Sequence, residues 1–128
     1  MGNQQILLVI VGVIIVALSI AVGLSLFDAQ SIASNRDAMI TDLQHISLMA
    51  YEYRLTIRTL GGGQGDYTTF TIPSNLTSSD NGTYSITDAQ VNSLTLQGVS
   101  ANNAANIITV IVDSYGKLGA LTFEGDFK

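Results

Sequence analysis

The sequence predicts an α+β protein in which a long N-terminal helix, apolar in its first half and amphipathic in its second, packs on a small antiparallel sheet of three to four strands. Three observations lead to this prediction. An uncharged apolar run extends from Ile6 to Phe27, a helical repeat of apolar residues continues to Tyr53, and short segments of alternating polarity follow residue 67. With 128 residues, the chain has room for one small folded unit besides the apolar run.

Residues 1–27 are predicted to form the apolar half of the helix. The run from Ile6 to Phe27, called the apolar segment below, carries no charge, and at about 1.5 Å per residue its length of roughly 33 Å is enough to cross the hydrocarbon core of a bilayer. A helix that is apolar on every side belongs in lipid or inside a protein assembly. Because the segment runs directly into a second helical pattern, we expect it to be retained rather than cleaved as a signal. The residues assigned here to this membrane or assembly segment, whose role in polymerisation is implied only by the family resemblance given below, are Ile6, Leu7, Val9, Ile10, Gly12, Val13, Ile14, Val16, Ala17, Ile20, Gly23, Leu24 and Phe27.

Residues 28–58 are predicted to form the amphipathic half. No Gly or Pro occurs between residues 24 and 58, so one helix can continue without interruption to about residue 54. Apolar residues recur at spacings of three and four, which places them on one face that can pack on a sheet. The residues assigned to this packing are Ile32, Ile40, Leu43, Ile46, Ala50 and Tyr53.

Residues 59–66 form a glycine-rich loop that ends the helix, with the sequence Gly61-Gly62-Gly63-Gln64-Gly65. A flexible loop is favoured over a phosphate-binding loop, because the Lys-Ser/Thr ending and the preceding strand of the latter are missing.

Residues 67–128 are predicted to form the antiparallel sheet. The candidate strands are 67–72, 83–87, 91–99, 107–112 and 118–123. Alternation puts Leu94 and Leu96 on a buried face, and Gly116 provides positive φ in a hairpin turn. The helical stripe would cover the apolar face of the sheet.

Composition argues against several classes of function. The chain has no cysteine, which excludes disulfides and thiolate chemistry, and a single histidine, His45, which we interpret as a solvated or interface residue. Five Lys and Arg against ten Asp and Glu give a net charge of −5, so nucleic acid is not an expected partner. We therefore expect no catalytic, metal or cofactor site. The acidic residues Asp66, Asp80, Asp88 and Asp113 lack the ligand spacing of a calcium loop.

Two short motifs match the acceptor sequence for N-linked glycosylation. They are Asn75-Leu76-Thr77 and Asn81-Gly82-Thr83, so Asn75 and Asn81 are candidate glycosylation sites.

The layout of the apolar segment, the stripe from Ile32 to Tyr53, the glycine loop and the strands after Tyr67 resembles the type IV pilin superfamily. The resemblance implies a structural subunit of an extracellular cell-surface filament, with the apolar segments bundled in its core. It also implies residence in the cytoplasmic or inner membrane before assembly. The implied partners are further copies of the chain, that membrane and a pilus assembly machinery. A minor pilin or pseudopilin, or a monomeric membrane-anchored binding module, is the alternative. The disulfide loop common in this family has no counterpart here, since cysteine is absent.

Overall fold

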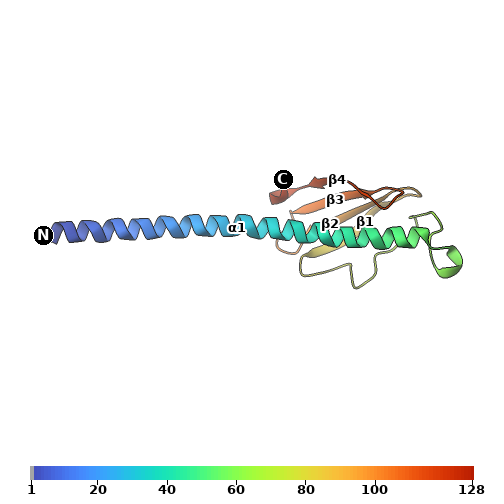
Figure 1. The fold of residues 1–128 in the computed structure, drawn as a ribbon, viewed down its shortest axis with the longest axis horizontal. Coiled ribbons are helices and arrows are strands. Elements are labelled where there is room, and N and C mark those ends of the chain that lie inside the picture. The colour runs from blue at the N-terminus through green and yellow to red at the C-terminus, as the bar shows by residue number, and fades with distance from the viewer. Residues whose placement is uncertain (1) are drawn as a thin grey trace. The chain divides into compact units, whose positions relative to one another are not determined.

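A computed structural model describes residues 2–128 and confirms the α+β fold, with one long helix and a four-stranded antiparallel sheet (Figure 1). The chain divides into two compact units at the bond between Ala33 and Ser34, and the second, Ser34–Lys128, is called the globular unit below. Over the described residues, the elements are the helix α1 (Gly2–Leu55), the strands β1 (Gly82–Ala89), β2 (Leu94–Ser100), β3 (Ile107–Val112) and β4 (Leu118–Phe123), and the short 3₁₀ helices η1 (Arg58–Leu60) and η2 (Gly125–Phe127).

The sheet is a meander in the order β1-β2-β3-β4, in which each strand pairs with its neighbours in the chain. Leu96 of β2 lies opposite Ile86 of β1 and Val110 of β3. Alternate residues of the central strands are fully buried, as the period of two predicts: Leu94, Leu96, Ile108, Val110 and Val112. The predicted strands 107–112 and 118–123 are reproduced at their predicted bounds, while 83–87 extends to Gly82–Ala89 and 91–99 moves to Leu94–Ser100.

The part of α1 within the second unit covers the apolar face of the sheet. Met39, Leu43, Ile46 and Ala50 are buried against it, at spacings of three and four residues. The contact is close at Gly98 of β2, where a Cβ atom would lie 3.0 Å from the Met39 methyl carbon and from the Tyr84 ring. Of the residues assigned to packing, Leu43, Ile46 and Ala50 are thus buried, whereas Ile32, Ile40 and Tyr53 are half-buried.

The predicted strand at 67–72 is wrong, because this segment forms turns and pairs with no strand. Its aromatic residues face the helix instead. The Tyr67 hydroxyl donates to the Asp113 carbonyl at 2.7 Å, and the Tyr67 ring lies 5.2 Å beneath the Arg54 guanidinium. The Phe70 and Tyr53 rings are 5.4 Å apart. These anchors, rather than a hydrogen-bond ladder, bury Tyr67 and Phe70.

The glycine-rich loop is a hydrogen-bonded cap on the end of α1, in place of the flexible loop that the sequence suggests. Backbone N–H groups of Gly63 and Gly65 donate to the carbonyls of Tyr53 and Arg54 at 2.9 and 2.7 Å. Carbonyls in the last turn of a helix lack their usual partners, so the loop supplies donors to both, although the Tyr53 carbonyl also accepts the Thr56 N–H at 3.2 Å. Gly65 has φ of +87°, and a Cβ atom on Gly63 would lie 2.0 Å from the Asp66 carbonyl oxygen, so glycine is required at both positions.

Polar side chains also join the helix to the second half of the chain. One Asp42 carboxylate oxygen accepts hydrogen bonds from the Ser79 hydroxyl at 3.0 Å, the Asn81 amide at 3.1 Å and the Tyr84 hydroxyl at 2.5 Å. We call these four residues the Asp42 cluster. Burial opposes ionisation of Asp42, but the three hydrogen bonds outweigh it, so the pKa of Asp42 lies below its ordinary value. Burial and the bond to Asp42 raise the pKa of Tyr84.

A second polar contact lies deeper. The Ser100 hydroxyl donates to the Asn35 side-chain oxygen at 2.5 Å, and the Asn35 amide donates to the Asn81 carbonyl at 3.0 Å. Both Asn35 and Ser100 are buried, so these bonds satisfy groups that would otherwise be costly to remove from water.

Candidate functional site: the apolar segment of α1

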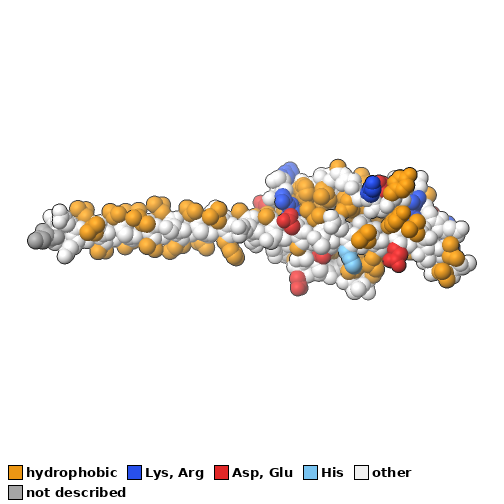
Figure 2. Space-filling view, viewed as in Figure 1, with side chains coloured by type: hydrophobic (Ala, Val, Ile, Leu, Met, Phe, Trp, Pro, Cys, Tyr) orange, Lys and Arg blue, Asp and Glu red, His pale blue; other side chains and the backbone are white. Residues whose placement is uncertain are grey.

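The side chains of the apolar segment, residues 6–27, are exposed in the part of the chain that the structure describes. Its large hydrophobic side chains are 49% to 71% exposed, with Ile10 the least and Leu8 the most accessible. Figure 2 shows hydrophobic side chains along this part of the helix and no charged ones on the face drawn. Since apolar residues occupy every turn and every face, no single stripe marks a partner, and the whole cylinder requires cover.

The segment has the length and composition of a membrane-spanning helix. Its most apolar 18-residue window has a mean hydropathy of 3.2, and none of that window is buried within the protein. The Ser19 hydroxyl donates to the Ile15 carbonyl at 2.9 Å, so this polar group is satisfied within the helix. Such internal satisfaction suits a surface that is placed in lipid or in a dry protein core, because water is absent from both.

The glycines of the segment are not required by the protein's own fold. A Cβ atom on Gly12 or Gly23 would meet nothing within 4 Å, and neither residue has positive φ. A glycine in a helix interior nevertheless costs about 1 kcal/mol relative to alanine. Gly12 lines a shallow groove along the helix surface, together with Val9, Val13, Val16, Ala17 and Ile20.

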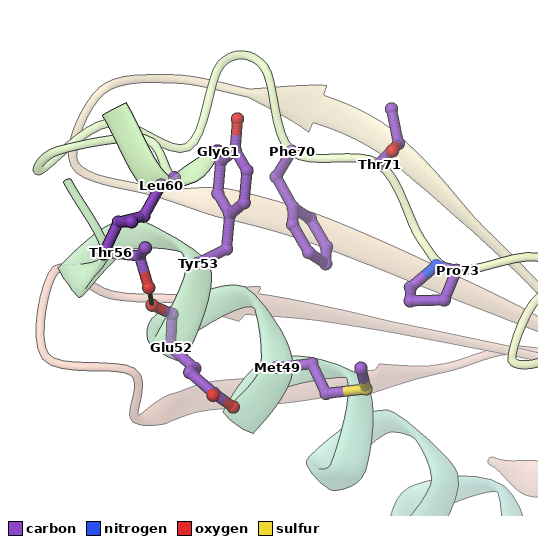
Figure 3. Close-up of a pocket in the computed structure, with 10 residues that line it drawn as sticks. Met49, Glu52, Tyr53, Thr56, Leu60, Gly61, Phe70, Thr71 and Pro73 are labelled. Atoms are coloured by element: carbon purple, nitrogen blue, oxygen red, sulfur yellow. Dashed lines mark hydrogen bonds between the residues drawn. The ribbon is translucent and has the colours of Figure 1, made fainter. Parts of the chain in front are cut away.

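A second depression lies in the globular unit, at the end of α1 (Figure 3). Its lining is mostly apolar, and the rings of Tyr53 and Phe70 project into view side by side. No periodicity in the sequence predicts this groove, although the apolar Leu60 beside the glycine run is a signal for it. The lining residues are Met49, Glu52, Tyr53, Thr56, Leu60, Gly61, Gly62, Phe70, Thr71 and Pro73.

Among the residues that line the groove, Glu52 is the one carboxylate, Tyr53, Thr56 and Thr71 carry hydroxyls, and no histidine is present. Across residues 2–128, no group of three His, Asp or Glu side chains is arranged to hold a metal ion. His45 is exposed.

Two of the four acidic residues considered for calcium, Asp66 and Asp113, serve as turn caps. Asp66 accepts the Thr68 N–H at 2.7 Å, and Asp113 accepts the N–H groups of Tyr115 and Lys117 at 2.9 Å each. One carboxylate oxygen of each residue is thus engaged in its own turn.

The two candidate glycosylation sites lie close in sequence but differ in environment. Asn75 is exposed in a turn, whereas Asn81 is half-buried and belongs to the Asp42 cluster.

Searches with this chain find no matching protein-family model, no matching curated protein and no matching solved structure.

Proposed function

We propose that the chain is a structural subunit that polymerises through its apolar segment into an extracellular cell-surface filament, after residence in the cytoplasmic or inner membrane. The observation that carries this proposal is the exposed apolar cylinder of residues 6–27, which none of the described residues 2–128 buries. The pilin-like arrangement of a long helix followed by a small sheet supports the same proposal.

The apolar segment cannot remain in water. Sixteen of its 22 residues are Leu, Ile, Val or Phe, and burial of each such side chain contributes about 1.5–3 kcal/mol relative to water. The total is on the order of tens of kcal/mol, which makes the monomer insoluble without a membrane or further copies. Lipid supplies most of this gain as well, so transfer from membrane to filament depends on packing between helices.

Small residues within the segment provide for that packing. Gly12, Gly23 and Ala17 leave shallow sites where a neighbouring helix backbone can approach closely. In a helix that serves only as a lipid anchor, these glycines would lower helix propensity without relieving any contact within the chain's own fold.

The distribution of charge fits an inner and an outer layer. All 15 charged residues of the chain lie at Asp28 or beyond, in the part that the sheet and its covering helix occupy. In a filament this part forms the surface that contacts water, while the uncharged segments form the dry interior.

A monomeric anchored binding module is the second candidate, and the apolar groove of Figure 3 is the observation that favours it. A minor pilin or pseudopilin combines features of both. These candidates differ in abundance, since a major filament subunit dominates surface material whereas an anchored module remains in membranes.

Electron microscopy of material sheared from cells, combined with mass spectrometry of its protein, tests the proposal. We expect fibres in which this chain is the predominant protein, and loss of the fibres on deletion of its gene. Recovery of the chain in the membrane fraction alone, as a monomer in detergent that forms no fibres after detergent removal, would refute the filament and favour the anchored module.

A further inference from the structure

The two acceptor motifs for N-linked glycosylation allow a sharper statement than the sequence does, because the structure places them in contrasting surroundings. We propose that Asn75 carries an N-linked glycan and that Asn81 does not. The inference rests on the proposed function in one respect, since the globular unit must lie outside the membrane to meet a glycan donor.

Asn81 is committed to the fold through three separate groups. Its side-chain amide donates to Asp42 at 3.1 Å, its backbone N–H donates to the Ser79 hydroxyl at 3.2 Å, and its carbonyl accepts bonds from Asn35 and from the Ala101 N–H, both at 3.0 Å. The nitrogen that would receive the sugar is thus already a hydrogen-bond donor inside a cluster.

The rest of the second motif is equally constrained. Thr83 lies in β1 opposite Val99 of β2. Gly82 is buried, and a Cβ atom at this position would lie only 2.4 Å from the Val99 carbonyl oxygen, so β1 and β2 are in close contact here. A transferase must bind the acceptor motif as a peptide that is free of its own sheet. Presentation of Asn81 would therefore require the start of β1 to separate from β2.

Asn75 meets the opposite conditions. It is exposed, and no side-chain hydrogen bond within the described residues involves it. Its motif lies outside the four strands, in a turn closed by the Leu76 N–H donating to the Pro73 carbonyl at 2.8 Å. One backbone bond ties the motif to the sheet, from the Tyr84 N–H of β1 to the Thr77 carbonyl at 2.8 Å, and Asn75 itself takes no part in it. The Thr77 hydroxyl, which a transferase reads, is held by one bond to the Ser74 carbonyl at 2.9 Å. That single local bond can be exchanged for one to an enzyme.

The space around Asn75 directs a glycan outward. A small pocket beside it has a volume of about 40 Å³, which suits a water molecule but not a hexose ring. A sugar on Asn75 would therefore extend into solvent and leave the Asp42 cluster in place. The pocket is lined by Asp42, His45, Ile46, Asn75, Leu76, Ser79 and Tyr84.

The transfer uses an oligosaccharide carried on a lipid phosphate or pyrophosphate as the donor. The side-chain nitrogen of Asn75 forms a bond to the anomeric carbon of the first sugar, and the bond from that carbon to the phosphate oxygen breaks. The lipid phosphate leaves with the electron pair of that bond, and one amide proton passes to a base of the transferase.

Digestion before aspartate separates the two motifs, because Asp66, Asp80 and Asp88 flank them. In protein isolated from the cells that make it, peptide 66–79 contains Asn75 and peptide 80–87 contains Asn81. We expect a glycan mass on 66–79 alone. An unmodified 66–79 peptide, or a glycan on 80–87, would overturn the inference.

Matched variants identify the motif that is used. Thr77→Val and Thr83→Val each destroy one motif while leaving its asparagine in place. Thr77→Val should abolish the glycan, and Thr77→Ser should retain it because serine also completes the motif. Thr83→Val should leave the mass of the attached glycan unchanged. Microscopy of the same preparations separates the two proposals. Filaments with bare Asn75 would refute glycosylation alone, and glycosylated Asn75 on a protein that never forms filaments would refute the filament alone.

Discussion

A single charge in the apolar segment should separate membrane insertion from filament assembly. Val13 is 63% exposed in the isolated chain and lies within the groove at Gly12. We consider Val13→Asp, with Val91→Asp as the matched control. Val91 is also an exposed valine, at 51%, but it lies in the turn between β1 and β2.

Membrane insertion should survive the substitution. The sixteen Leu, Ile, Val and Phe residues contribute about −0.3 to −0.6 kcal/mol each on the insertion scale, or roughly −5 to −10 kcal/mol in total. One aspartate near the centre of a helix costs about 2.5–3.5 kcal/mol, which leaves the balance favourable.

Assembly should not survive it. In a filament core every copy would bury one carboxylate without a partner, and the effective cost of removing one such charge from water is several kcal/mol. A loss of about 3–5 kcal/mol per subunit raises the concentration needed for assembly roughly 10²- to 10⁴-fold. Carbonate-washed membranes should still contain Val13→Asp, while sheared material should contain no fibres, and Val91→Asp should form fibres as the parent does. Normal fibre yield from Val13→Asp would refute burial of the segment in a filament, and equal loss in both variants would show that the effect is not specific to the segment.

Three further predictions concern the segment and the globular unit. A Cβ atom at Gly12 would meet nothing within 4 Å, so the Gly12→Leu side chain should fit without a clash within its own chain. We therefore expect a normal amount of this variant in membranes but a reduced yield of fibres in sheared fractions. An unchanged fibre yield would contradict close helix approach at this site. Leu96→Ala removes a fully buried side chain from β2 and should lower the free energy of unfolding by about 2–5 kcal/mol in thermal denaturation, whereas Val91→Ala should change it by less than about 0.5 kcal/mol. Asp42→Asn should lower the melting temperature at pH 7, while Asp37→Asn, at a carboxylate paired with Arg36 alone at 3.6 Å, should not. Because the pKa of Asp42 in the folded protein lies below its ordinary value, the stabilisation from its carboxylate is present above about pH 4 and is lost as pH falls through the folded pKa. The melting temperatures of the parent protein and of Asp42→Asn should therefore converge in acid. A difference that stays constant with pH would contradict an ionised Asp42.

The periodicity of the sequence was sufficient to predict most elements of the fold. The lack of Gly and Pro predicted a helix to about residue 54, and α1 ends at Leu55. Alternation around Leu94 and Leu96 predicted β2 and its buried face, and Gly116, with φ of +77°, lies in the predicted hairpin turn. These features are local, so neighbouring residues determine them.

The features that sequence did not predict depend on contacts between distant residues. Residues 67–72 alternate as a strand would, yet Tyr67 is drawn to Asp113 and Arg54, and no edge of the sheet accepts the segment. The buried Asn35 is polar and interrupts the apolar stripe, and its partner Ser100 is 65 residues away. The 3.6-residue period of a helix identifies which side chains are apolar and face the core, but it does not indicate a buried hydrogen bond between two polar residues such as Asn35 and Ser100.

The candidate site was predicted in outline, because an uncharged run of this length is visible without any tertiary information. That its glycines clear no space for the protein's own fold required coordinates. So did the groove at the end of α1, which brings Phe70 beside Tyr53 across the glycine cap.

The meander topology has a consequence for the order in which the chain acquires its structure. Hydrogen-bonded strands follow one another in the chain, so sheet formation requires the closure of short connections alone. The docking of helix on sheet closes far larger loops, such as the 60 residues between Arg54 and Ser114. The helix leaves the ribosome first and meets its apolar counterpart last. We therefore expect docking, rather than strand pairing, to set the folding rate. Until that step is complete, a newly made chain should expose the apolar face of the sheet and the apolar side chains of α1 that cover it.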